Sequence, residues 1–392
     1  MARWLVEQMA VSGLDASYQA ISEGQGNAIG RIRGAGGGPT LLLYGHIDTH
    51  LSGRDEEDSP ATHGTLPAMS RPAAYRDGDQ LFGLGAGNPK SYSACMLSAA
   101  TAVARAGIPL HGDLVVGLAA GGMPMNAPAC APQQNIGQGA GCTFMLQQGL
   151  RPDFAVIGKP GHAVAWEEVG VCYFRVRVKG LFGYAGARHI LEYKNPIVDA
   201  ATVIRELEEW CQRYTAANTS DYVAPQAAIG AIRGGWPHTP SFIPAWTDIH
   251  LDVRVSPRGD PLNVRRQLDS ALEEICARHP ELELDLRMEL AIPGSRTDPE
   301  SWVIGSCVRA FEDVERRPHV PIEETSGATD AEILRMWGIP TARFGMASSV
   351  RSETPSLEMD MDSVELPSMS RFVDALLYVI VDTCGRPLSE IR

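Results

Sequence analysis

The sequence predicts an α/β protein with a mainly parallel sheet, into which a smaller α+β domain is inserted. In the first part of the chain, short apolar segments typical of buried strands alternate with helical segments. From residue 173 onward, strands instead alternate apolar and polar residues, as strands with one wet face do. The α/β pattern returns near the end. We therefore expect a discontinuous larger domain, residues 1–172 and 291–392, with residues 173–290 inserted in it.

The first part of the larger domain opens with an amphipathic segment that predicts a helix over residues 1–9. Strands are predicted at Asn27–Arg33, Thr40–Leu43, Asp113–Leu118 and Phe154–Ile157, and helices at Ser91–Ala106 and Thr143–Leu150. Several of these strands are almost wholly apolar, which indicates a sheet covered by helices on both faces.

The inserted segment has the order strand, helix, strand, strand, helix, strand. The predicted strands are Tyr173–Lys179, Ala227–Ile232, Thr247–Val255 and Leu282–Leu290, and the helices are Pro196–Tyr214 and Pro261–Arg278. This order is that of a ferredoxin-like α+β domain. After it, helices are predicted at Pro299–Glu312, from Ala328, and at Pro367–Asp382.

Composition excludes several functional classes. The 392 residues are 44% apolar and 21% charged, which is ordinary for a globular enzyme, and the net charge of -13 disfavours nucleic acid and anionic membranes as partners. No apolar run reaches the length of a membrane span, and no signal-peptide pattern opens the chain. The eight cysteines are scattered without a Cys-x-x-Cys pair, so we expect reduced thiols and a cytoplasmic location.

The most informative segment is residues 41–50, where four apolar residues run into Gly45, then His46 and, two positions on, Asp48. A buried parallel strand delivers a metal ligand to its carboxyl end in this way, with a carboxylate beside the imidazole to orient it. The segment therefore predicts one half of a metal site.

Further motifs follow in a fixed order: residues 77–90, Ser241–Pro244, Asp252–Arg254, Ser326–Asp330 and Gly338–Gly345. Together with the first motif they resemble the zinc-dependent metallo-exopeptidase and deacylase family. That family includes carboxypeptidase G, aminoacylase, acetylornithine deacetylase and succinyl-diaminopimelate desuccinylase. The resemblance covers nearly the whole chain, including the inserted domain.

The resemblance implies roles for individual residues. His46 would bind metal and Asp48 would orient it. The inserted domain, residues 173–290, would act as a lid and form a homodimer or higher homo-oligomer. Substrate contacts are expected from four residues that match the lid and the closing motifs: Tyr184, His238, Arg254 and Gly345.

The departures from the family pattern concern the ligands themselves. Asn88 stands where the family has a carboxylate that bridges two metals, and a neutral amide cannot neutralise two cations. Gly121 and Gly122 fall where the family has two glutamates, one of them the general base. Lys159 replaces an acidic ligand, and Glu353 takes the place of the last histidine ligand. A two-zinc site is therefore not expected.

Two interpretations of the altered site remain open. In the first, one labile divalent ion (Mn, Zn, Co or Fe) binds to His46, Asn88 and Glu353, with His50 or the Glu323–Glu324 pair as a further ligand or base. In the second, the Lys159 ammonium occupies the space of the lost ion and pairs with Glu353 or Asp48. Asp48 and Lys159 are the predicted catalytic residues.

The predicted function is hydrolysis of a C–N bond in a small carboxylate-bearing molecule. The bond would belong to an amide, or to the amino group of an activated aromatic acid, as in nitroanthranilate aminohydrolase. General peptidase activity is not expected, because the glutamate base is missing. The alternative is a metal-free protein of the same fold that binds a small ligand or serves in an assembly. Metal-free catalysis supported by Lys159 is a third possibility.

Overall fold

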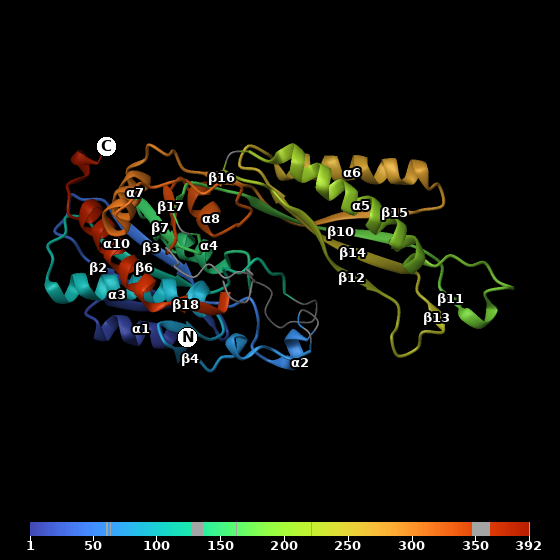
Figure 1. Cartoon of the computed structure of the whole chain (residues 1–392), viewed down its shortest axis with the longest axis horizontal. Helices are drawn as coiled ribbons and strands as arrows, with labels where there is room; N and C mark the ends of the chain where they lie inside the picture. The colour runs from blue at the N-terminus through green and yellow to red at the C-terminus, as the bar shows by residue number, and fades with distance from the viewer. Residues whose placement is uncertain are drawn as a thin grey trace. The chain divides into compact units, whose positions relative to one another are not determined.

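The computed structural model describes residues 1–59, 62, 64–127, 136–161, 163–220, 222–346 and 361–391. The chain forms two compact units (Figure 1). The larger unit consists of Met1–Trp166, Thr297–Ile322 and Thr329–Arg392, and the inserted unit of Glu167–Arg296 and Glu323–Ala328.

The inserted unit extends a few residues beyond the predicted range 173–290. It begins and ends with two short strands, β9 (Glu167–Glu168) and β16 (Ser295–Arg296), which pair with each other. The sequence did not predict the contribution of residues 323–328, which join this unit through a bridge between Val223 and Thr325.

The larger unit is built on a mixed sheet with the strand order β1-β2-β6-β3-β7-β17-β8. Its strands are β1 (Asp15–Ser22), β2 (Gln25–Ile32), β3 (Leu41–His46), β6 (Leu114–Ala119), β7 (Phe154–Gly158), β8 (Val164–Ala165) and β17 (Thr341–Phe344). The four central strands β6, β3, β7 and β17 are parallel, and the outer pairings are antiparallel. The α/β class is thus confirmed, with the parallel part confined to the centre of the sheet.

Both faces of the central strands are covered by helices, which explains their continuous apolar sequence. On one face, Leu41 and Leu43 of β3 pack in a core with α1 (Ala2–Val11), α3 (Ser91–Ala106), α7 (Trp302–Glu315) and α10 (Leu366–Cys384). On the other face, Leu42 and Tyr44 pack with α4 (Ala140–Gln147) and α8 (Ala331–Met336). Every residue of β3 is buried as a result.

The inserted unit has the predicted ferredoxin-like arrangement. Its sheet has the order β12-β14-β10-β15, formed by β10 (Gly170–Lys179), β12 (Ala227–Gly234), β14 (Trp246–Val255) and β15 (Leu284–Ile292). The helices α5 (Pro196–Asn218) and α6 (Pro261–Arg278) share one apolar core with this sheet. Each helix begins with proline after a capping side chain, Asn195 and Asp260, that accepts a backbone N–H bond.

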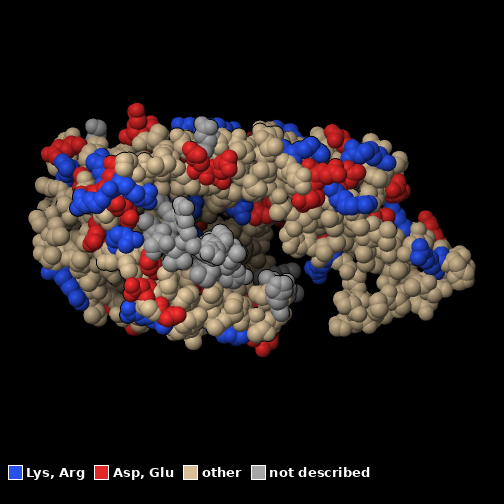
Figure 2. All heavy atoms as spheres, in the orientation of Figure 1, with Lys and Arg blue, Asp and Glu red and all other residues tan. Residues whose placement is uncertain are grey.

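The remaining described elements are short: α2 (Asp55–Asp58), β4 (Tyr75–Asp77), β5 (Gln80–Phe82), β18 (Ser363–Glu365), and a hairpin of β11 (Gly183–Tyr184) with β13 (Phe242–Ile243). Acidic and basic side chains are interspersed over the described surface of the face in Figure 2. Among the helices that the structure describes, none is both long and apolar enough to cross a membrane.

Candidate functional site

The candidate site of the larger unit is formed where the central strands end. His46 is the last residue of β3, Lys159 directly follows β7, and Gly121 and Gly122 come just after β6. Asn88 lies in the turn Ala86–Lys90 that leads into α3. Because parallel strands end at the same edge of a sheet, these four chain segments converge there.

His46 and Asp48 form the pair that the sequence predicts. The His46 Nδ1 atom lies 3.2 Å from Asp48 Oδ1 and 3.0 Å from the Asp48 carbonyl oxygen. The Asp48 carboxylate also accepts hydrogen bonds from the backbone N–H groups of Gly122 and Met123, both at 2.8 Å. Since Nδ1 faces two oxygens it carries the proton, and Nε2 is left as the acceptor.

Lys159 lies against that acceptor. Its ammonium group contacts Nε2 of His46, and its Nζ atom lies 3.4 Å from Oδ1 of Asn88. All three side chains are buried, with 8%, 1% and 7% of Lys159, His46 and Asn88 exposed. Burial and the neighbouring Lys159 lower the pKa of His46, so the imidazole is neutral and accepts a hydrogen bond from the Lys159 ammonium. An ammonium thus sits where the sequence predicts a metal.

The described residues do not fit a divalent ion in this arrangement. The Nε2 lone pair, which would bind the ion, is already engaged by Lys159. In the part of the chain that the structure describes, no three His, Cys, Asp or Glu side chains are grouped to hold a metal. Glu353 lies outside the described residues, so its role as a ligand stays a prediction. Of the two interpretations, this geometry favours the lysine, whose ammonium contacts His46 and Asn88. Its pairing with Glu353 or Asp48 stays a prediction.

Gly121 and Gly122 leave no room for the two family glutamates. Gly121 adopts a φ of +71°, in the left-handed region that favours glycine. A Cβ atom on Gly122 would overlap the Cβ of His46 and would lie 2.9 Å from Oδ2 of Asp330. A side chain at position 122 is therefore incompatible with the present position of His46.

Tyr44 and Asp330 are site-supporting residues to which the sequence analysis assigned no role. Tyr44 is fully buried, and its hydroxyl donates a hydrogen bond to the Asp330 carboxylate. Burial, and then the charge of Asp330, raise the pKa of Tyr44 well above its usual value. The signal was present, because Asp330 ends the Ser-Gly-Ala-Thr-Asp motif and Tyr44 stands two residues before His46.

Three of the predicted substrate contacts belong to the inserted unit. Arg254 donates to Oδ2 of Asp252 at 2.7 Å. Tyr184 is 53% exposed and its ring lies 5.9 Å from that of Phe242. His238 lies in an exposed loop between β12 and β13. Their contacts with substrate stay predictions.

The fourth predicted substrate contact, Gly345, belongs to the larger unit and packs against the backbone of Lys159 and Gly161. His50, a predicted reserve ligand, lies with its Nε2 atom 3.8 Å from Oδ2 of Asp362.

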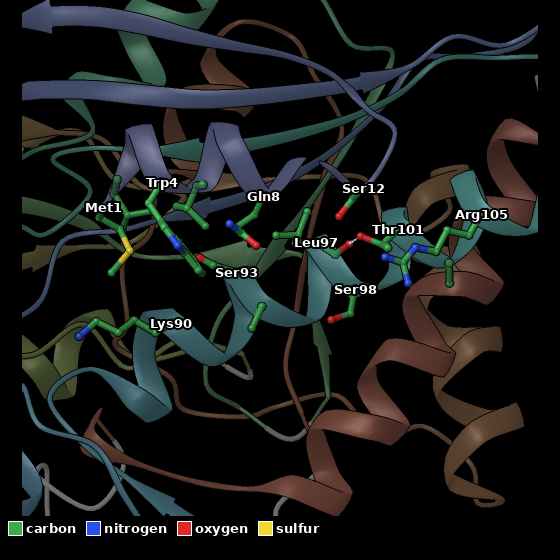
Figure 3. Close-up of a pocket in the computed structure, with 14 residues that line it drawn as sticks. Met1, Trp4, Gln8, Ser12, Lys90, Ser93, Leu97, Ser98, Thr101 and Arg105 are labelled. Carbon is green, nitrogen blue, oxygen red and sulfur yellow. Dashed lines mark hydrogen bonds between the residues drawn. The ribbon is translucent and has the colours of Figure 1, made fainter. Parts of the chain in front are cut away.

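A groove of about 790 Å³ lies between α1 and α3 (Figure 3). It is lined by Met1, Trp4, Leu5, Gln8, Ser12, Ile47, Lys90, Ser93, Ala94, Leu97, Ser98, Thr101, Ala102 and Arg105. Lys90 and Arg105 appear at opposite ends of the view, and Lys90 donates to the Leu84 carbonyl oxygen. Because the described residues that line it include no carboxylate or imidazole, we place the chemistry at the strand ends.

Replacing Asp48 with asparagine is expected to lower the free energy of unfolding by about 1–3 kcal/mol at pH 7. The amide has one acceptor oxygen, whereas the N–H groups that now bond to Asp48 have two carboxylate oxygens available. Burial raises the pKa of Asp48, but hydrogen bonds from His46 and the two backbone N–H groups leave it below 3.8. Its contribution is therefore present above that pH and lost as the pH falls below it.

Urea unfolding at pH 7 and at about pH 3 checks this, since the difference between Asp48→Asn and the native chain should shrink in acid. Asp77→Asn, at an exposed position, serves as the control. Equal stability of all three proteins at pH 7 would contradict the expectation.

No protein-family model matches the chain. A curated relative, succinyl-diaminopimelate desuccinylase of Leptothrix cholodnii, is 27% identical over 280 residues, which cover 69% of this chain and 67% of the relative. Human carnosine dipeptidase 1 has a similar structure, with a TM-score of 0.71 and 14% identity over 98% of this chain and 90% of that one. An M20 family metallo-carboxypeptidase of Sulfolobus solfataricus has a TM-score of 0.66 and 13% identity over 97% of this chain and 93% of that one.

These similar proteins are named as hydrolases of amide bonds, and one of them as a metalloenzyme. The solved structures share the fold, and the curated relative adds a sequence match over about two thirds of both chains. With the motifs in the family order and several ligand positions substituted, the chain is similar to M20-type exopeptidases and deacylases and shares their fold.

Proposed function

We propose that this chain hydrolyses a C–N bond in a small carboxylate-bearing molecule, at the site where β3, β6 and β7 end. The observation that carries the proposal is the buried chain of hydrogen bonds from Lys159 through His46 to Asp48. An ammonium held in a buried site is a fixed positive charge that favours a carbonyl or carboxylate oxygen. The amide-cleaving activities of the similar proteins support the choice of bond.

Each residue has a defined part in this proposal. Lys159 would attract the substrate oxygen that gains negative charge, and Asp48 would keep His46 in the tautomer that accepts at Nε2. In the reaction, water adds to the carbon, the C–N bond breaks, and the amine leaves with a proton. With glycine at positions 121 and 122, an electrophilic substrate is favoured over an ordinary peptide.

A single labile divalent ion, Mn, Zn, Co or Fe, is the cofactor that the sequence predicts, and M20 relatives include a metallo-carboxypeptidase. In this chain the ion would have to displace Lys159 from His46. We therefore propose an activity that does not require an added metal.

The second candidate is a protein that binds the same class of small carboxylate without hydrolysing it. One observation favours it: glycines stand at positions 121 and 122, where the resemblance places the general base, and a Cβ at position 122 would overlap His46. Binding by Lys159 would persist, while the activation of water would be absent.

The test is an incubation of the purified chain with N-acyl amino acids, ureido acids and amino-substituted aromatic acids, with products followed by mass spectrometry. We expect turnover that survives a chelator and falls about 100-fold or more in Lys159→Met, because the fixed charge is lost. Lys179→Met, at an exposed position of the inserted unit, is the matched control. A compound that raises Tm without being cleaved, with the shift lost in Lys159→Met, would identify the binding protein. Turnover that is unchanged in Lys159→Met would contradict both candidates.

We also propose that the chain is a homodimer or higher homo-oligomer through the inserted unit. Its hairpin region exposes large apolar side chains, with Phe182 69% and Trp236 66% exposed. Exposed apolar groups of this kind mark interaction surfaces. Light scattering after size exclusion should give the mass of an oligomer for the native chain and the mass of one chain for Phe182→Asp with Trp236→Asp. A monomeric native chain would overturn this proposal.

A further inference from the structure

We propose that Lys159 is a permanent substitute for a divalent ion, so that the native chain is metal-independent, and that Lys159→Glu alone turns the same pocket into a metal site. The inference concerns what occupies the pocket. It builds on the metal independence of the proposed function, but its test measures bound metal and not turnover, so the failure of one is distinguishable from the failure of the other.

The first argument is that the ammonium and an ion compete for one lone pair. The Nδ1 side of His46 is held by Asp48, which leaves Nε2 as the atom that can bind an ion. The Lys159 ammonium donates to that atom. A zinc ion needs a distance of about 2.0–2.1 Å from the imidazole nitrogen, so it cannot bind while the ammonium is in place.

The second argument is charge. The Asp48 carboxylate is already used by His46 and by the N–H groups of Gly122 and Met123. Asn88 offers its Oδ1 atom to the pocket without a negative charge. The positive charge of Lys159 therefore takes the place of the ion's charge, and adding an ion beside it would bring like charges together in a buried site.

The third argument is that position 159 is fixed by its backbone. The Lys159 N–H group donates to the Phe344 carbonyl oxygen at 3.3 Å, which continues the pairing of β7 with β17. On the other side, a Cβ on Gly345 would lie 2.7 Å from the Lys159 carbonyl oxygen, so the two segments are in close contact. A different side chain at position 159 would therefore still point into the pocket.

A carboxylate at position 159 would complete a donor set for zinc. It would lie beside Nε2 of His46 and Oδ1 of Asn88, the two atoms that Lys159 now contacts. One nitrogen, two oxygens and a water molecule match the four-coordinate geometry of zinc. Removal of the ammonium and gain of a negative charge both raise the affinity of the pocket for a divalent ion.

The experiment compares the native chain, Lys159→Glu and the control Lys179→Glu, which makes the same charge change at an exposed residue. Each protein is dialysed against zinc or manganese, and bound metal is measured by mass spectrometry together with Tm. We expect about one zinc per chain and a zinc-dependent rise in Tm for Lys159→Glu, because that chain has the ligand set. The other two proteins should retain less than about 0.1 zinc per chain, since a pocket held by lysine has no site for the ion. In the double variant Lys159→Glu with His46→Ala, the bound zinc and the zinc-dependent rise in Tm should both be lost.

Two results would overturn the proposal. One is a native chain that binds about one ion per chain and loses it in His46→Ala, since an ion would then coexist with Lys159. The other is a folded Lys159→Glu protein that binds no zinc. If Lys159→Glu does not fold, Lys159→Gln decides instead. This variant removes the charge and supplies an amide oxygen, so it should bind zinc about tenfold tighter than the native chain. Equal zinc affinities of the two proteins would overturn the proposal that Lys159 takes the place of an ion.

Discussion

Glutamate at position 122, the residue that the resemblance suggests for that position, is expected to destabilise the chain by about 3 kcal/mol or more instead of supplying a catalytic base. The cause is local. A Cβ atom on Gly122 would overlap the Cβ of His46, so either β3 or the Gly121–Gly122 segment has to move. The new carboxylate would also be buried close to Asp330, since that Cβ would lie 2.9 Å from the Asp330 Oδ2 atom.

Urea unfolding of Gly122→Glu, Gly122→Ala and Gly230→Ala separates these causes. Gly122→Ala carries the overlap without the charge and should lose about 1–3 kcal/mol. Gly230 lies in β12, and a Cβ there would meet nothing within 4 Å, so Gly230→Ala should be close to neutral. A Gly122→Glu protein as stable as the native chain would show that the site can open to admit the glutamate, which the packing of Gly122 against His46 forbids.

The second large effect is expected at alkaline pH, because the chain buries many reduced thiols. Seven free cysteines lie among the described residues, and six of them are buried. Burial raises the pKa of Cys95, Cys172 and Cys384 from 9.0 to about 12. It also raises the pKa of Cys142 and Cys307, and that of Cys211 to about 11.

The direction of the effect follows from the protons that each state binds. Below about pH 8.5 the thiols of the folded and unfolded chains are both protonated, and stability does not depend on them. Above that pH the unfolded chain loses protons that the folded chain retains, so each buried thiol removes up to about 1.4 kcal/mol of stability per pH unit. With six such groups, we expect cooperative unfolding before pH 11.

Circular dichroism during urea unfolding at pH 7, 9, 10 and 10.5, with a reductant present, measures this slope. A Cys307→Ala variant has one buried thiol fewer to lose its proton on unfolding. Its free energy of unfolding should therefore fall with pH less steeply, by about 1.4 kcal/mol per pH unit. Its stability at pH 7 serves as the reference, since the cavity acts at every pH. Stability that is unchanged up to pH 11 would contradict the burial of these thiols.

Elements with strong local signals were predicted closely. The bounds of α3 and α6 agree with the sequence, because apolar spacing coincides with clear ends: Gly107 after α3, in the left-handed region, and Asp260 before Pro261 in α6. The helix predicted at Thr143–Leu150 instead begins at Ala140, after Gly139 with a φ of +70°. The edge strand β1 was missed because its side chains are exposed or half-buried, so it lacks the apolar run of a central strand.

In the site, too, the sequence predicted local pairings but not contacts between distant segments. The pairing of His46 with Asp48 was predicted because the two residues are neighbours in the sequence and lie at a strand end. The contact of Lys159 with His46 joins residues 113 positions apart, and that of Tyr44 with Asp330 joins residues 286 apart. Contacts of this kind depend on the order of strands in the sheet, which hydrophobic periodicity does not specify.

The close packing of Gly122 against His46 also has an evolutionary consequence. Substitution at Lys159 can be tested by selection one step at a time, since that side chain fills a pocket built for a cation. A side chain at position 122 first requires displacement of His46, the residue that any bound ion would need. The two changes are therefore unequal in mutational accessibility. A single substitution can thus alter what the pocket binds, whereas an acidic side chain at position 122 needs several coordinated changes in the site.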